Sequence, residues 1–218
     1  MMTMLPARLS HAWLIPALGL LALSACSNPE KTARYLIDPP SVGGQVANNL
    51  GTAELKDVSL PEYASDQEVA WQTADGAVRS TPDDLWADNP QRAFTLSLAR
   101  AISDVSGATV IGEPWPLAEP PKRVLEVRVE KALAQANNVY RLSGRYFVSD
   151  EGSGGANHAR SFDISVPMSG EQPAAVAAAS SQAIAQLALQ IATLSGPGRT
   201  IATTAATSND PFALDPLF

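Results

Sequence analysis

The chain has 218 residues, 45% hydrophobic and 17% charged, which is enough for one folded domain with tails. Its formal net charge of −7 argues against a nucleic-acid partner, because phosphate binding relies on clustered lysines and arginines and the sequence has no such cluster. The single cysteine excludes an intramolecular disulfide and the thiolate sites of zinc and iron–sulfur proteins.

Candidates for catalysis are few. His11 lies in the amino-terminal leader described below, and His158 follows the glycine-rich stretch 152–155, which favours a mobile loop over an imidazole held in place. Asp83 and Asp84 are better explained as charges at a helix start than as an acid–base pair, although a carboxylate hydrolase is our third hypothesis. We predict no catalytic residue, no cofactor and no metal site.

The amino terminus has the pattern of a secretory leader, which we place at residues 1–25. A start with one positive charge, Arg8, is followed by twelve apolar residues from Ala12 to Leu23. This stretch is shorter than the roughly 20 residues of a membrane span. It has the length of the hydrophobic region of a signal peptide.

The leader ends in Leu23-Ser24-Ala25-Cys26, which resembles the lipobox of bacterial lipoproteins. The resemblance implies cleavage between Ala25 and Cys26, with an S-diacylglycerol and an N-linked acyl chain such as palmitate on Cys26. Several acyl chains hold a protein stably on a phospholipid membrane. Ser27 follows in place of the aspartate that marks inner-membrane retention, so we predict the periplasmic face of the outer membrane.

The first elements after the leader are short. Residues 26–32 predict a polar tether, and strands are predicted at 33–38 and 54–60. A hairpin is predicted at 68–80, because a glycine in its turn supplies a positive φ. The acidic residues after Pro82 predict the start of a short helix.

The most clearly amphipathic helix is predicted at 90–106. Its apolar residues recur on one helical face, Asn89-Pro90 provides a start signal and Gly107 a stop signal. A brief strand at 109–112 and a proline-rich loop at 113–121 are expected next.

Three segments with regular alternation, 124–133, 140–148 and 162–166, predict an antiparallel meander. The uncharged stretch 172–198 predicts a helix on this sheet, because glutamines recur every four residues opposite its apolar side. A membrane-spanning helix is the alternative. Because the outer side of the helix is uncharged, it could also pack against a second copy, so a homo-oligomer is a further hypothesis.

Together these elements predict an α+β fold at residues 33–195. We expect a two-layer domain with a mostly antiparallel sheet of about six or seven strands, packed by two long helices. The serine- and threonine-rich tail at 196–218 is predicted to be disordered. Its apolar end at 212–218 is either a frayed terminus or a short docking segment.

Several short motifs resemble the family of ABC-type transport auxiliary lipoproteins. They extend over roughly residues 26–194 and occur in this order: Tyr35-Leu36-Ile37-Asp38-Pro39 after the lipobox, Leu60-Pro61-Glu62-Tyr63 before Gln67-Glu68-Val69, Trp86 before the first long helix, Pro114-Trp115-Pro116 after it, and a closing helix rich in alanine, leucine and isoleucine.

The resemblance implies a non-enzymatic accessory component of a lipid-transport system between the inner and outer membranes. Its expected partners are a periplasm-spanning protein with mammalian-cell-entry (MCE) domains and an inner-membrane permease. Tyr63, Trp86 and Trp115 are the expected interface residues, with core packing as the alternative for the tryptophans. A direct lipid-binding shuttle, with Trp71, Trp86 and Trp115 near its entrance, is the second hypothesis. An envelope-stress structural lipoprotein is another.

Overall fold

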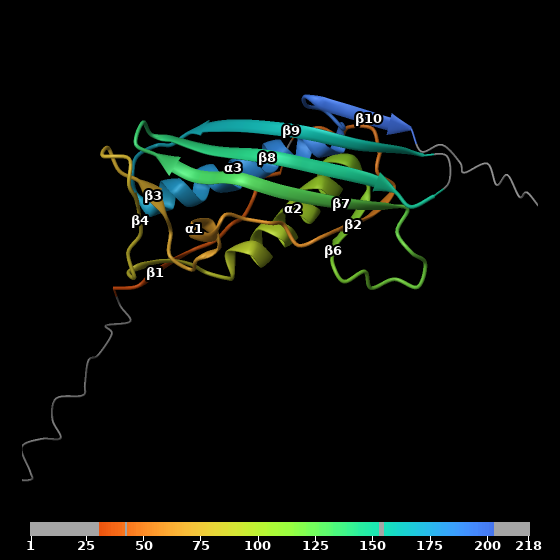
Figure 1. Cartoon of the computed structure of the whole chain (residues 1–218). Helices are drawn as coiled ribbons and strands as arrows, with labels where there is room; N and C mark the ends of the chain where they lie inside the picture. Colours follow the sequence, from red (N-terminus) through yellow and green to blue (C-terminus); the bar gives the residue numbers. More distant parts are fainter. Residues whose placement is uncertain (1–30, 42, 153–154, 203–218) are drawn as a thin grey trace, which may run out of the picture. The chain divides into compact units, whose positions relative to one another are not determined.

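A β-sheet and a pair of long helices make up the two layers of the folded domain (Figure 1). The computed structural model describes residues 31–41, 43–152 and 155–202, of which those from Thr32 onward belong to one compact unit. The predictions for the leader, for Cys26 and for residues 212–218 lie outside the described residues.

The sheet layer has eight strands in the described part of the chain. They run in the order β10-β9-β8-β7-β2-β6, with β3 beside β7 and β4 beside β3. Their bounds are β2 (Thr52–Leu55), β3 (Trp71–Gln72), β4 (Val78–Arg79), β6 (Thr109–Gly112), β7 (Arg123–Gln135), β8 (Val139–Asp150), β9 (Ala156–Pro167) and β10 (Gly198–Ala202). The strands from β7 to β10 are antiparallel, and β2 runs parallel to β6 and β7. The predicted α+β fold with a mostly antiparallel sheet is confirmed.

The helical layer consists of α2 (Pro90–Ser106) and α3 (Pro173–Ala192), which pack against each other. A one-turn helix, α1 (Glu62–Ser65), and a small parallel sheet of β1 (Ala33–Tyr35) and β5 (Asp84–Trp86) complete the described elements. A side-chain oxygen of Asn89 accepts the Arg92 N–H at 3.0 Å at the start of α2. Gly107, with φ of 66°, ends this helix as predicted.

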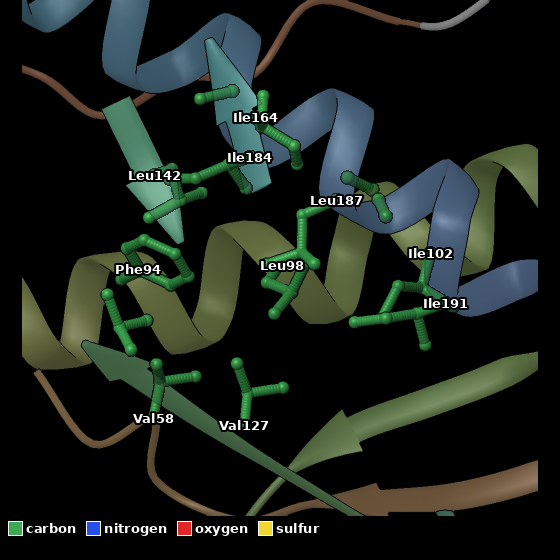
Figure 2. Close-up of a cluster of buried hydrophobic side chains, with 14 of the residues drawn as sticks. Val58, Phe94, Leu98, Ile102, Val127, Leu142, Ile164, Ile184, Leu187 and Ile191 are labelled. Carbon is green, nitrogen blue, oxygen red and sulfur yellow. The ribbon is translucent and has the colours of Figure 1, made fainter. Parts of the chain in front are cut away.

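Apolar side chains from both layers meet in one core, shown in Figure 2. Leu98 and Ile102 of α2 face Ile184, Leu187 and Ile191 of α3, and none of the five has exposed surface. Burial of each such side chain stabilises the fold by about 1.5–3 kcal/mol. α3 has the length and hydropathy of a membrane span, but 67% of its most apolar window is buried in the fold. It therefore forms the predicted helix on the sheet.

The structure corrects the prediction of a short helix after Pro82. The chain makes a turn there, closed by the Asp84 N–H to the Thr81 carbonyl at 3.4 Å, and then enters β5. β5 pairs in parallel with β1 and buries Trp86 to 7% exposure. The pairing partner lies about fifty residues earlier in the sequence, so the local acidic pattern did not reveal it.

The predicted disorder from residue 196 is wrong for Gly198–Ala202, which form β10 on the edge of β9. β9 begins at Ala156, so His158 lies in a strand and not in the predicted loop. Gly198, with φ of 150°, allows the close approach, because a Cβ there would lie 2.0 Å from the Ala159 carbonyl oxygen.

A β-bulge breaks the predicted regular alternation of β7. The register with β8 shifts between Val129 and Lys131, so Ala132 and Ala134 face the core after the bulge. Gly144 lies opposite Val129, and a Cβ at this glycine would meet the Arg128 carbonyl oxygen at 2.2 Å. The missing side chain of Gly144 therefore permits the close approach of the two strands at the bulge.

The Gly144→Ala variant should be destabilised by about 1–3 kcal/mol, as for other overpacked cores. Its Cβ would also lie 2.9 Å from Cζ of Phe162, so neither neighbouring strand offers room. Urea denaturation of the variant and the parent gives the difference in the free energy of unfolding. Gly43→Ala is the control, because a Cβ there meets nothing within 4 Å. Equal stability of the two variants would contradict this account of the bulge.

Alkaline pH should destabilise the domain through two core tyrosines. Burial raises the pKa of Tyr140 and of Tyr146 to about 12 from an ordinary value of 10.0. The folded state thus favours the neutral phenols, and the resulting stability is lost as the pH rises from about 10 towards 12. The ultraviolet absorbance of tyrosinate should show two groups titrating near 12 in the folded chain. Tyr140→Phe should remove one of them, whereas two ordinary titrations would contradict the packing.

Candidate functional site

The chain enters the folded domain on the helical side of the sheet. β1 begins seven residues after Cys26, the predicted lipidation site, which lies outside the described residues together with the Ala25–Cys26 bond. Just after β1, the Asp38 N–H donates to Ser181 Oγ of α3 at 3.0 Å, and Asp38 forms an ion pair with Arg100 of α2 at 2.6 Å. These contacts fix the entry segment to both long helices.

Two of the three predicted interface residues, Tyr63 and Trp86, lie beside one cavity, and only Trp86 belongs to the core. Tyr63 and Trp86 line a void of about 20 Å³ between the sheet and the helices. Trp86 is 7% exposed, and the hydroxyl of the half-buried Tyr63 accepts the Ala132 N–H at 3.3 Å. Core packing, the alternative weighed for Trp86, therefore describes its surroundings.

Trp115 lies apart from these two residues, in the proline-rich loop between β6 and β7. It is half-buried, and its indole N–H donates to the Glu119 carbonyl at 2.7 Å. Its backbone N–H donates to a carboxylate oxygen of Glu54 on β2 at 2.9 Å. These bonds show how Trp115 organises its own loop, and part of its surface remains exposed.

The void beside Trp86, between the sheet and the helices, is too small for a lipid chain. The void of about 20 Å³ beside Trp86 is close to the size needed by one water molecule, roughly 10–15 Å³. Ligand pockets usually measure about 300–1,000 Å³. Trp71 lines a different feature, an open groove of about 460 Å³ at the end of the sheet near the start of α3. This groove is open to the surface, and Ala134 and Met168 at its base belong to the edge of the core.

The sheet face opposite the helices has a cluster that the sequence patterns did not single out. We call it the basic sheet face and define it by Arg128, Arg145, Phe147 and Arg199. The guanidinium carbons of Arg128 and Arg145 lie 5.2 and 5.4 Å from the centroid of the Phe147 ring, within cation–π range. Arg199 of β10 lies two strands further along on the same face, because Phe147 of β8 pairs with Ala159 of β9 and Ala159 pairs with Arg199.

One signal in the sequence could have revealed this cluster. The core-facing residues of β8 alternate with Arg141, Ser143 and Arg145, and Phe147 continues the polar series at the same spacing. A large aromatic residue in an otherwise polar, outward-facing series is the exception that marks a contact site.

Charges on the basic sheet face are only partly neutralised. Arg128 pairs with Glu126 at 2.6 Å, and Arg141 beside the face makes two hydrogen bonds to Asp163, which lower the pKa of that carboxyl. Among the described residues, no carboxylate lies within ion-pair distance of Arg145 or Arg199. A chain with a net charge of −7 thus presents a surface with excess positive charge.

The titratable groups considered for catalysis contact other side chains of the fold. Asp84 accepts hydrogen bonds from the Tyr35 hydroxyl at 2.9 Å and the Thr81 hydroxyl at 3.2 Å. His158 Nδ1 lies 3.2 Å from Thr200 Oγ1 of β10, and burial, aided by nearby arginines, lowers its pKa. Over the described ranges, no three histidine, cysteine or acidic side chains are grouped so as to hold a metal ion.

Comparisons with known proteins agree with this fold. A crystal structure of an uncharacterized protein superposes with a TM-score of 0.57 at 18% identity, covering 69% of this chain and 96% of the other. The crystal structure of protein XCC0632 from Xanthomonas campestris, of the DUF330 family, has a TM-score of 0.52 at 16% identity, covering 74% and 93%.

A search of curated proteins found no match. The family model described as "ABC-type transport auxiliary lipoprotein component" matches residues 35–192, from the last residue of β1 to the end of α3. This match covers both layers of the described fold. The chain therefore belongs to the family of ABC-type transport auxiliary lipoproteins.

Proposed function

We propose that this auxiliary lipoprotein is anchored in the outer membrane through Cys26 and docks the far end of an MCE-type lipid-transport system. Its partners would be a periplasm-spanning MCE-domain protein and, through it, an inner-membrane permease. The family assignment supports a role in ABC-type transport. The lipobox pattern before Cys26 and the following Ser27 support the anchor and the outer membrane.

The observation that favours docking over lipid carriage is the filled interior. The void beside Trp86, between the sheet and the helices, holds only about 20 Å³ and lies next to fully buried side chains of the core. The larger grooves that α3 helps to line lie at the two ends of this helix. A lipid acyl chain would have to displace side chains such as Phe94 and Val176, which line the void. Close-packed interiors resist such displacement. A direct lipid shuttle is therefore the less favoured hypothesis.

We place the docking surface on the basic sheet face. The tether joins the domain on the helical side, where Asp38 contacts α2 and α3, so the opposite sheet face is directed away from the point of attachment. Phe147 supplies an aromatic anchor, and Arg145 and Arg199 supply charges without an ion-pair partner in the described fold. Aromatic and arginine side chains dominate the energetics of interfaces. This surface suits an acidic face of the MCE-domain partner.

The anchor is tested by replacing Cys26 with serine. Without the thiol, no thioether can form, so the chain should stay uncleaved or be released from the outer membrane, as measured by density-gradient fractionation of cell envelopes. Ser27→Asp is the matched control, because it keeps the thiol and should move the processed protein to the inner membrane. A normally processed Cys26→Ser chain in the outer membrane would contradict the proposal.

The docking surface is tested by recovery of the MCE-domain protein on the purified lipoprotein. Combining Arg145→Glu with Phe147→Ser should lower recovery about tenfold or more, because loss of a hot-spot residue costs ~2 kcal/mol and ~1.4 kcal/mol corresponds to a factor of ten. Arg92→Glu on the exposed side of α2 is the matched charge reversal and should have no effect. Equal recovery by all variants would exclude this face, and no recovery by the parent chain would exclude the partner.

A further inference from the structure

Two exposed leucines share one surface groove on the helical side of the domain. Leu36 is 70% exposed and Leu96 is 48% exposed, and both line a shallow groove of about 180 Å³. Its other apolar lining residues are Tyr35, Ile37, Trp86 and Ala93. The remaining large, exposed hydrophobic residues of the described chain, Val78, Leu117 and Ile201, lie on other elements. We call the surface around the first two leucines the Leu36–Leu96 patch.

The fold holds Leu36 outward by fixing both of its neighbours. The Tyr35 hydroxyl donates to Asp84 at 2.9 Å, and the Ile37 carbonyl accepts the Ser97 hydroxyl of α2 at 3.1 Å. Because successive side chains of an extended segment point to opposite sides, fixing Tyr35 and Ile37 against the domain leaves Leu36 facing solvent. Its exposure is therefore imposed by the hydrogen bonds on either side.

Leu96 lies between two arginines on the outer side of α2. Arg92, Leu96 and Arg100 are four residues apart and therefore share one helical face. Arg92 forms an ion pair with Asp88, and Arg100 forms one with Asp38. The rim of the patch is thus locally neutral. In a chain with a net charge of −7, such a rim avoids the repulsion that unpaired acidic residues would meet at anionic lipid headgroups.

The length of the tether limits how far this patch can lie from the anchor. Ala33, the first residue of β1, is seven positions after Cys26, and a fully extended chain over seven positions spans at most ~25 Å. Leu36 follows Ala33 by three residues. If Cys26 is acylated, as proposed above, the patch remains next to the lipid surface in which the acyl chains are embedded.

From these observations we infer that the Leu36–Leu96 patch contacts the phospholipid surface that holds the Cys26 anchor. This inference rests on the proposed lipid anchor. The acyl chains provide one attachment point and the two leucines a second, so the domain would be held in one orientation. The helical layer then faces the membrane, and the basic sheet face is turned to the periplasm.

The test uses the full, acylated chain reconstituted in vesicles of phosphatidylethanolamine and phosphatidylglycerol. Cys26 is the only cysteine, and acylation blocks its thiol, so Leu36→Cys or Leu96→Cys introduces the one reactive thiol. An environment-sensitive fluorophore on either position should show a blue shift and lose emission when spin-labelled lipid is included. Leu117→Cys and Ile201→Cys are the matched controls, because these leucine and isoleucine residues are 51% and 57% exposed on other elements. They should show neither change.

Three results would overturn the inference. Fluorophores at positions 36 and 96 that are insensitive to lipid would exclude the contact, as would equal responses at all four positions. A blue shift that appears in detergent without phospholipid and grows with protein concentration would assign the patch to a second copy.

The parent chain separates this inference from the proposed anchor. If the parent chain reacts with the fluorophore, Cys26 is not acylated and the proposed function fails. If it is unreactive and positions 36 and 96 show no response, only the membrane contact is excluded.

Discussion

Burial of α3 against both α2 and the sheet is the interaction on which the rest of the structure depends. α3 has no charged residue, and Ile184, Leu187 and Ile191 lose all of their exposed surface in contact with the other elements. The helix is too apolar to be left in water. It contacts β8 and β9, whereas α2 contacts β6 at the other edge of the sheet. Its carboxyl end is tied to the sheet by Tyr146, whose hydroxyl contacts the carbonyl oxygens of Gln190 and Ser195. α3 thereby closes the core and also brings the chain back to the edge of β9, where β10 forms.

An element could be predicted from the sequence where neighbouring residues determine it, and could not where a partner distant in the sequence does. The long strands and both long helices follow from local periodicity, and their predicted types are confirmed. β5 and β10 are short and pair with partners far away in the sequence, so no local pattern identifies them. The bulge in β7 could not be predicted from its own alternation, because the glycine that permits it lies in the neighbouring strand. Long-range packing therefore determined what local patterns missed.

The candidate site shows the same division between composition and position. Aromatic residues of the family-like motifs, Tyr63, Trp86 and Trp115, were the expected interface residues. Their surroundings separate them, because Trp86 packs in the core and Trp115 organises a loop. Phe147 has the same chemistry and an outward position, flanked by Arg128 and Arg145. Only the register of β8 distinguishes it from Tyr146, its fully buried neighbour. An aromatic residue of a strand is available to a partner only if its side chain is on the outer face of the sheet. A single bulge is enough to move the following side chains to the other face.

A membrane anchor changes how strong the surfaces of this domain need to be. Attachment at Cys26 would hold the domain at the membrane surface. Its further contacts, with the bilayer or with a partner, would then form at an effective concentration of roughly the millimolar range. Contacts that are weak in free solution, such as two leucines on a bilayer or two arginines and a phenylalanine on a partner, then suffice to orient the domain. Because the two surfaces lie on opposite sides of the fold, each can be occupied without excluding the other. The close-packed core between the two surfaces keeps them in a fixed orientation relative to each other. A docking component needs such rigidity, whereas a lipid carrier needs an interior that opens.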